Sequence, residues 1–416
     1  MIFPGRFPWV YVLRILALQA AATAFTADWP DWRGPNRDGY TTETFPTTLP
    51  ANPPVRWKKS VGHGYAGVVV GGDQLIYADE SAGHETIHAV QLKDGHEVWT
   101  TPVAPVWNDE FENGPRCTPV LTGGRVFFQS NQGEFVALDA TNGRRLWGFN
   151  FKSYGAFWVP SPNSGVGAAN RRGHAGSPLV VGDRVVVQVG STNNAGLCAF
   201  QVADGKLLWR SQNDLTCFSS PVYAQLAGRG QVVAATCEGL LGVALDDGHP
   251  LWRIPFRTGA NRNVLTPLID GDTVTFASHT TGLRRVRVTG TGPTQQAQDQ
   301  WFNPQLRINL STPVRVGDHY YGMGPAKNYV CIDRATGTVQ WAESGFEGAA
   351  ATITDGQRLL VLLDSGEVRL LTATPEKYTE LGRFQASGKT MSHPAWSDGR
   401  LYVRDSREIQ VYELKK

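Results

Sequence analysis

Residues 137–147 (ALDATNGRRLW) and 331–341 (CIDRATGTVQW) share a pattern that recurs along the whole chain. In both segments a glycine precedes a tryptophan by four residues. The same spacing occurs five times in all, in the pairs Gly95 and Trp99, Gly143 and Trp147, Gly205 and Trp209, Gly248 and Trp252, and Gly337 and Trp341. Self-similarity of this kind is the sequence signature of a repeat architecture.

Each repeat also carries strand and turn signals ahead of the tryptophan. A Ser-Pro or Thr-Pro pair precedes an apolar run, a glycine-containing turn and a second apolar run, as in residues 118–130 (TPVLTGGRVFFQS) and 177–189 (SPLVVGDRVVVQV). Gly-Gly and Gly-Asp pairs suit tight hairpins. The repeat therefore predicts four strands, the last of which contains the tryptophan.

The spacing of the units predicts how many there are. Trp57 opens the series, and two further units without the glycine end at Trp301 and Phe384. The eight positions lie about 47 residues apart on average, which is the spacing of propeller blades. After Phe384 the chain supplies three strands, and residues 55–60 supply the missing fourth, which closes the ring and hides both open edges. We therefore predict an all-β, eight-bladed propeller over residues 55–416.

The repeated residues have structural roles in this prediction. Glycine permits the positive φ of the turn into the last strand. Asp139 and Asp333 are expected to hydrogen-bond the backbone of that turn. An indole buries roughly 150–250 Å², and we expect each repeat tryptophan to pack flat against the next sheet. These are Trp57, Trp99, Trp147, Trp209, Trp252, Trp301 and Trp341.

The N-terminus predicts export. Arg6 and Arg14 precede a ten-residue apolar stretch, and residues 22–24 (ATA) form a small-x-small cleavage site. We predict a signal peptide over residues 1–24 and a leader over residues 25–54. The alternative is an uncleaved anchor, although Arg14 interrupts the longer apolar span. No cysteine near the cleavage region allows lipidation, so the mature chain is predicted to be periplasmic or extracellular, without a transmembrane span.

The charge balance excludes one class of function. The chain has 39 Lys and Arg against 37 Asp and Glu, and the first 24 residues hold two arginines and no acid. A neutral mature chain does not fit a nucleic-acid-binding protein, whose affinity comes from neutralising phosphates. With 41% hydrophobic residues, the composition also argues against disorder.

Five cysteines are spread along the chain, and none is adjacent to another. Cys217 and Cys237 flank a hairpin that turns near residues 227–229. They could face each other as a disulfide or lie in the core as two buried thiols, and a one-residue change of register reverses the outcome. Both alternatives stay open.

From about Trp57 onward, the repeats resemble the tryptophan-docking motif of the pyrroloquinoline-quinone (PQQ)-like propeller repeat family. Residues 28–39 (DWPDWRGPNRDG) look like the start of exported bacterial members. The resemblance implies the propeller fold. It implies no single role, because the family contains quinone-dependent alcohol dehydrogenases and also propellers without a cofactor, such as the lipoprotein that assists outer-membrane protein assembly.

The chain departs from both kinds of member. The dehydrogenases stack the quinone on two adjacent disulfide-bonded cysteines, and this chain has no such pair and no CxxCH haem site. Their calcium ligands cannot be carried over residue by residue. The assembly lipoprotein needs a lipidated cysteine, which this chain lacks. We therefore expect no cofactor, with PQQ and calcium as the alternative.

The candidate binding face is formed by the loops that lead into each Ser/Thr-Pro strand. Two of these loops, residues 101–116 and 150–176, are long, and propeller insertions tend to gather on binding faces. The alternative is that they are solvated loops. Asn263 and Asn309 stand four residues before a proline, as His174 does. The candidate residues are Trp107, Asp109, Glu110, Arg116, Trp158, Arg171, His174, Asn263 and Asn309.

The sequence thus predicts an exported, monomeric, non-catalytic scaffold that binds a protein or a small extracytoplasmic ligand. The alternative, from a different class, is a PQQ-dependent oxidoreductase. No GxSxG, P-loop or HExxH pattern is present to indicate another chemistry.

Overall fold

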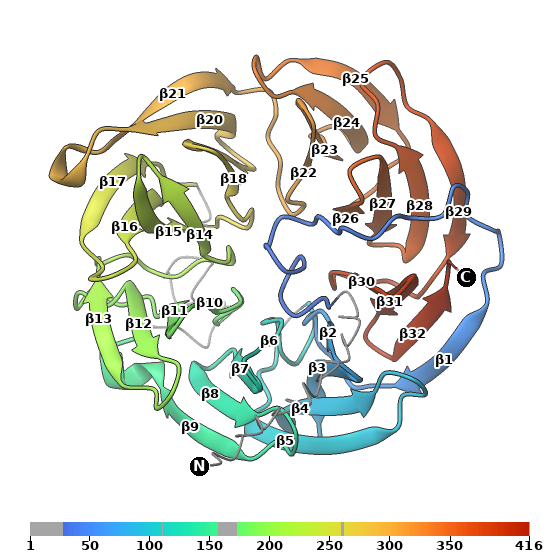
Figure 1. Ribbon diagram of the computed structural model, residues 1–416, viewed down its shortest axis with the longest axis horizontal. Coiled ribbons are helices and arrows are strands. Elements are labelled where there is room, and N and C mark those ends of the chain that lie inside the picture. The colour runs from blue at the N-terminus through green and yellow to red at the C-terminus, as the bar shows by residue number, and fades with distance from the viewer. Residues whose placement is uncertain (1–27, 110, 157–172, 259–261, 416) are drawn as a thin grey trace, which may run out of the picture.

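The computed structural model describes residues 28–109, 111–156, 173–258 and 262–415. Over these residues the chain forms eight four-stranded antiparallel sheets arranged around one axis, with two short 3-10 turns and no long helix (Figure 1). The eight-bladed propeller predicted from the repeat is confirmed. The predicted signal peptide lies outside the described residues.

The blades follow one another in chain order, each from its inner to its outer strand. Blade 1 consists of β2 (Val69–Gly71), β3 (Gln74–Ser81), β4 (His84–Gln91) and β5 (Glu97–Pro105). Blade 2 consists of β6 (Val120–Thr122), β7 (Arg125–Gln129), β8 (Glu134–Asp139) and β9 (Arg145–Asn150). Blade 3 consists of β10 (Leu179–Val181), β11 (Arg184–Gln188), β12 (Leu197–Gln201) and β13 (Leu207–Ser211), and blade 4 of β14 (Val222–Leu226), β15 (Arg229–Thr236), β16 (Gly239–Ala244) and β17 (Pro250–Pro255).

Blades 5 to 7 repeat this arrangement, with β18 (Leu268–Asp270), β19 (Thr273–Ser278), β20 (Gly282–Thr289) and β21 (Gln296–Asn303); β22 (Val314–Val316), β23 (His319–Met323), β24 (Asn328–Asp333) and β25 (Val339–Ser344); and β26 (Ala350–Thr354), β27 (Arg358–Leu363), β28 (Glu367–Thr372) and β29 (Glu380–Gln385).

Blade 8 closes the ring with strands from both ends of the chain. β30 (Ala395–Ser397), β31 (Arg400–Arg404) and β32 (Glu408–Glu413) form its inner three strands, and β1 (Val55–Ser60) is its outer strand. β1 pairs antiparallel with β32, from Val55 opposite Tyr412 to Ser60 opposite Glu408. The predicted closure is confirmed.

The repeat tryptophans join each blade to the next. The Trp99 Nε1 atom on β5 donates to the carbonyl of Ala140 in blade 2 at 2.9 Å, and its ring lies over Gly143. The φ of Gly143 is +71°, and a Cβ there would lie 2.5 Å from the indole. The glycine therefore serves both the turn and the tryptophan. The same docking is seen for Trp57 on Gly95, Trp147 on Gly205, Trp209 on Gly248 and Trp301 on Gly337.

Two repeat tryptophans depart from this pattern. The Trp341 Nε1 atom donates to the carbonyl of Thr374 in blade 7 at 2.9 Å, but the ring meets Tyr378 edge-on and lies on no described glycine. Trp252 departs further. The Trp252 Nε1 atom donates to the side-chain oxygen of Gln231 within its own blade, at 2.8 Å. Gln231 in turn bonds Gln295 of blade 5. Blade 5 lacks the glycine spacing, so it offers no glycine on which an indole can lie, and the amide pair replaces that contact.

The carboxylates of Asp139 and Asp333 accept hydrogen bonds from the turn backbone at Thr141 and Thr336, as predicted.

The Ser/Thr-Pro motif also connects blades. The Ser220 hydroxyl accepts from the backbone N–H of Ser177, and the Thr266 hydroxyl accepts from that of Ser220. The Thr312 hydroxyl continues the series by accepting from Thr266 at 3.1 Å. These bonds link the starts of successive inner strands around the axis. The recurring Ser or Thr hydroxyl of the motif therefore connects neighbouring blades.

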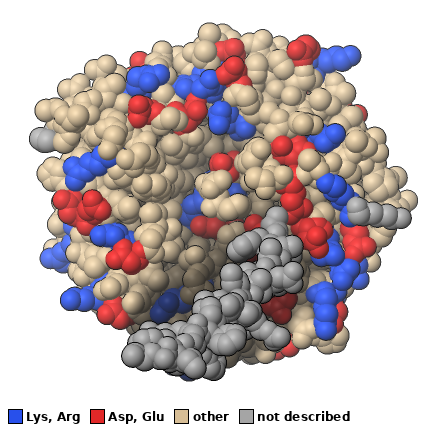
Figure 2. All heavy atoms as spheres, in the orientation of Figure 1, with Lys and Arg blue, Asp and Glu red and all other residues tan. Residues whose placement is uncertain are grey.

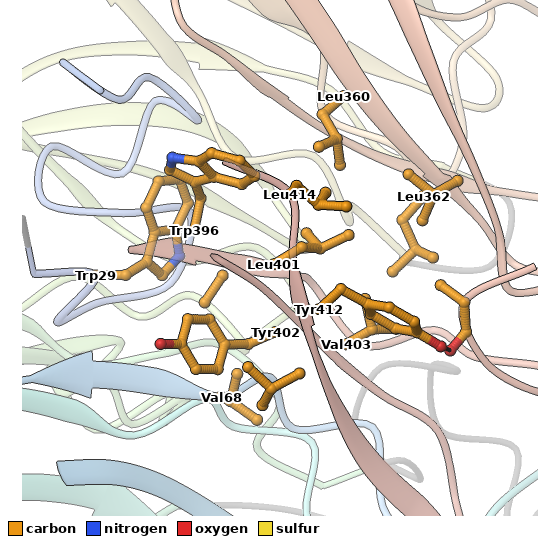
Figure 3. Packing of buried hydrophobic residues seen from close by; sticks show 14 of the residues in the cluster. Trp29, Val68, Leu360, Leu362, Trp396, Leu401, Tyr402, Val403, Tyr412 and Leu414 are labelled. Atoms are coloured by element: carbon orange, nitrogen blue, oxygen red, sulfur yellow. Dashed lines mark hydrogen bonds between the residues drawn. The ribbon is translucent and has the colours of Figure 1, made fainter. Parts of the chain in front are cut away.

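The leader packs into the ring as part of the fold. In Figure 1 its blue trace runs from the centre of the ring across blade 7 to the start of β1. Trp29 pairs with Val70 of β2, and Tyr40 pairs with Thr354 of β26. Figure 3 shows Trp29 beside Trp396 of β30 within the largest apolar cluster.

Two buried arginines fasten the leader across the axis. Arg37 donates to the carbonyls of Pro178 and Pro221 at 2.6 and 2.5 Å, and it pairs with Asp31 at 3.0 Å. Arg33 donates to the carbonyl of Pro313 at 2.7 Å. These prolines directly precede the inner strands of blades 3, 4 and 6. Because the two arginines bond three blades from one segment, the leader spans the channel.

Candidate functional site

A pocket of about 580 Å³ opens around the axis, on the face formed by the loops that lead into the inner strands. Every blade contributes to its lining through such a loop. The contributions, in chain order of the loops, are Tyr65, Arg116, Ala175, Phe218, Val264, Leu310, Ala349 and His393. We call this pocket the funnel. It lies on the face that the sequence selected as the candidate binding face.

The leader helps to form the bottom of the funnel. Trp32 lines the pocket, and its ring meets that of His393 edge-on, with centroids 5.3 Å apart. A second pocket, of about 350 Å³, includes Arg37 and Tyr40 in its lining. Trp32 lines the funnel and Arg37 lines the second pocket, so the leader contributes to both.

The rim of the funnel carries exposed apolar side chains. Phe111 is 67% exposed, and Leu310 and Met391 are each 39% exposed. They come from the loops before β6, β22 and β30. Scattered exposed apolar residues are ordinary, but a group around one concavity is a feature of binding sites.

Charged groups in the funnel are mostly basic. Arg116, Arg262 and Lys389 line it together with one carboxylate, Asp364. Arg116 pairs with Asp109 at 3.3 Å and lies over the ring of Tyr65, with its guanidinium carbon 5.3 Å from the centroid. The ion pair holds the arginine in place at the wall of the pocket.

Two other predicted residues, His174 and Asn263, are buried. His174 packs edge-on against Phe151, and burial lowers its pKa to about 4, so the ring is neutral at physiological pH. The Asn263 amide donates to the carbonyl of Thr236 at 2.6 Å. Neither side chain reaches the surface of the funnel.

The remaining predicted residues lie in different places. Trp107 belongs to the loop before β6, and its side chain is buried. Asn309 is exposed and accepts a hydrogen bond from Arg262 at 3.0 Å, which places it next to the funnel. Glu110, Trp158 and Arg171 lie outside the described residues.

Sequence reasoning missed Trp32 and His393. Trp32 lies in the leader segment that carries the family resemblance, but nothing in its spacing indicates that it reaches the axis. Burial and the neighbouring Arg33 lower the pKa of His393 to about 3. At neutral pH the ring is therefore uncharged, and it can serve only as a neutral hydrogen-bonding and stacking group.

The funnel has few donors for a metal. Among the described residues, no group of three or more His, Cys, Asp and Glu side chains is placed to hold a metal ion.

The described part of the chain contains no helix that is long and apolar enough to cross a membrane. On the face in view in Figure 2, acidic and basic side chains are interspersed around the rim, without a large patch of one sign.

The comparisons with known proteins agree on one family. The family model described as outer membrane protein assembly factor BamB matches residues 84–343. The protein of that name from Burkholderia pseudomallei is 28% identical over 222 residues, which is 52% of this chain and 50% of the relative. The chain thus matches only half the length of this relative.

Solved structures share the fold at low identity. BamB from Moraxella catarrhalis superposes with a TM-score of 0.60 and 17% identity, covering 86% of this chain and 98% of the other. Quinohemoprotein alcohol dehydrogenase from Comamonas testosteroni gives a TM-score of 0.65 and 12% identity, covering 93% and 80%. Together with the docked tryptophans and the matched family model, these findings show that the chain belongs to the family of PQQ-like β-propeller repeat proteins related to BamB.

Proposed function

We propose that this protein is an exported, monomeric, non-catalytic scaffold that binds a segment of a partner protein at the funnel. The observation that carries the proposal is the group of apolar side chains around the funnel rim, Phe111, Leu310 and Met391, above a pocket of about 580 Å³. Fully burying one exposed large apolar side chain is worth about 1.5–3 kcal/mol, so a partner that covers this rim gains most from Phe111 and a smaller amount from Leu310 and Met391, which are each only 39% exposed.

A protein partner follows one branch of the family, and relatives named as dehydrogenases match the chain too. Relatives named as an outer membrane protein assembly factor match this chain in sequence and in fold. The pocket volume also lies within the range of small-molecule sites, which keeps a small extracytoplasmic ligand as the alternative occupant.

Site-specific photo-crosslinking tests the proposal. A photoreactive phenylalanine analogue replaces Phe111 or Leu310 on the rim. Controls carry it at Val98 or Val339 on the outer strands β5 and β25, which are 41% and 42% exposed and so match Leu310. We expect protein adducts in the cell envelope from the rim positions and not from the controls. Equal labelling at both sets of positions, or no adduct from the rim, would contradict the proposal.

A second candidate is a PQQ-dependent oxidoreductase. The observation in its favour is the axial pocket, where the ring of Trp32 and three basic side chains could accept a planar, anionic quinone. The residues do not fit a calcium centre, because among the described residues that line the funnel Asp364 is the one carboxylate. We therefore propose that no cofactor is used. Reconstitution with PQQ and calcium, followed by dye-linked alcohol oxidation, tests this, and turnover that a chelator abolishes would favour the oxidoreductase.

A further inference from the structure

Two of the five cysteines lie in one small cluster next to the funnel. Cys217 precedes β14 in the loop that lines the funnel, and Cys237 lies in the turn between β15 and β16. Both thiols are almost completely buried, and they pack with Leu215 and Phe218. Cys117, Cys198 and Cys331 belong to three other clusters of the core.

The backbone places the two segments side by side. The N–H of Cys237 donates to the carbonyl of Leu215 at 3.2 Å. The Cys237 thiol donates to the carbonyl of Thr216 at 3.0 Å, and the Cys217 thiol donates to that of Ala235 at 2.8 Å. Each sulfur is therefore directed at the segment that carries the other. The two backbones are within hydrogen-bonding distance and the two residues share one cluster, and such proximity is what a disulfide requires.

We propose that Cys217 and Cys237 are a modification site, at which the two thiols are oxidised to a disulfide as the chain folds in the presence of a small-molecule or protein disulfide. The exchange consumes one external disulfide bond and forms the Cys217–Cys237 bond. The two thiol protons and the two electrons pass to the oxidant, which leaves as two thiols. The physiological setting rests on the export proposed above, whereas the pairing rests on the contacts of the two residues.

Burial decides when the reaction occurs. It raises the pKa of Cys217 to about 12, so the folded, reduced thiol is protonated and slow to exchange. Oxidation therefore takes place before the core closes over the pair or through local opening.

The bond would fasten one wall of the funnel. Phe218 follows Cys217 directly and lines the pocket, and its N–H donates to the carbonyl of Asn263 at 3.1 Å. Thr236, beside Cys237, bonds Asp214 at the start of the same loop at 2.5 Å. A disulfide here would tie the loop to the β15–β16 turn covalently, where hydrogen bonds now hold it.

Thiol counting on the full chain tests the pairing without any variant. The protein is refolded with oxidised glutathione, denatured without reductant and alkylated. We expect three alkylated cysteines and one cross-linked pair of peptides containing Cys217 and Cys237, against five alkylated cysteines after reduction. Five alkylated cysteines in the oxidised sample, glutathione adducts on either residue, or a cross-link that involves Cys117, Cys198 or Cys331 would overturn the proposal.

Stability provides a second readout with a matched control. Closing a loop of about 20 residues lowers the unfolding equilibrium constant about a hundredfold. Reductant should therefore destabilise the wild type and a Cys331→Ser variant to the same extent, and should leave Cys217→Ser unaffected. A Cys217→Ser variant that keeps the reductant effect would overturn the pairing. None of these outcomes depends on whether a partner binds the funnel.

Discussion

Replacement of Gly143 by alanine tests the tryptophan docking on which the ring depends. The φ of Gly143 is +71°, and a Cβ there would lie 2.5 Å from Cε3 of Trp99 and 2.6 Å from the hydroxyl of Thr101. Two separate costs follow. The left-handed backbone costs an L-residue about 1–2 kcal/mol, and forcing a methyl group against a packed side chain costs about 1–3 kcal/mol.

Gly182 supplies the matched control. Its φ is +59°, and a Cβ there would meet nothing within 4 Å. Gly182→Ala should therefore cost only the backbone term, about 1–2 kcal/mol, whereas Gly143→Ala should cost about 2–5 kcal/mol. Urea unfolding followed by circular dichroism measures the free energy of unfolding of each variant.

A double-mutant cycle identifies the clashing partner. In a Trp99→Ala background the indole is absent, so the cost of Gly143→Ala should fall toward that of Gly182→Ala. Equal costs for the two glycine variants in the wild-type background would refute the reasoning, and so would a cost at Gly143 that persists without Trp99. The first result would mean that the glycine serves the turn alone, and the second would assign the clash to the hydroxyl of Thr101.

Three further predictions concern closure, the leader and pH. Deletion of residues 55–60 removes the outer strand of blade 8, so we expect aggregation or a large loss of thermal stability, and an unchanged cooperative melt would contradict the closure. Arg37→Met leaves Asp31 buried without its partner, so we expect a loss of about 3–5 kcal/mol in urea unfolding, which Asp31→Asn in the same chain should partly restore. Burial raises the pKa of Glu85 from 4.5 to about 8, so the native state holds a proton that the unfolded state releases, and stability falls as pH rises from about 4.5 to 8. Glu85→Gln should therefore be more stable than wild type by about 2–5 kcal/mol at pH 9, with a smaller gap at pH 5, and parallel pH profiles would contradict this assignment.

The candidate site could be predicted only in part. The sequence selected the loop face at which the funnel opens, and it selected Arg116 and Asp109, which form an ion pair at its wall. It could not separate these from His174 and Asn263, which occupy similar positions in the repeat and are buried. Contacts formed in the folded ring decide which side chains reach the surface, and spacing carries no information about those contacts.

The sequence by itself determined the blade count, the ring closure and the place of each repeat tryptophan. These follow from short-range rules, because a hairpin recurs in every unit, and a glycine turn and a docking indole recur in most units and act on the next one. Only the tertiary structure decided that the leader crosses the channel, with Arg33 and Arg37 bonded to strands far away in the sequence. It also decided that Trp32 and His393 meet at the axis and that Cys217 lies against Cys237. Such contacts occur once each, between segments that only the closed ring brings together, so no periodicity records them.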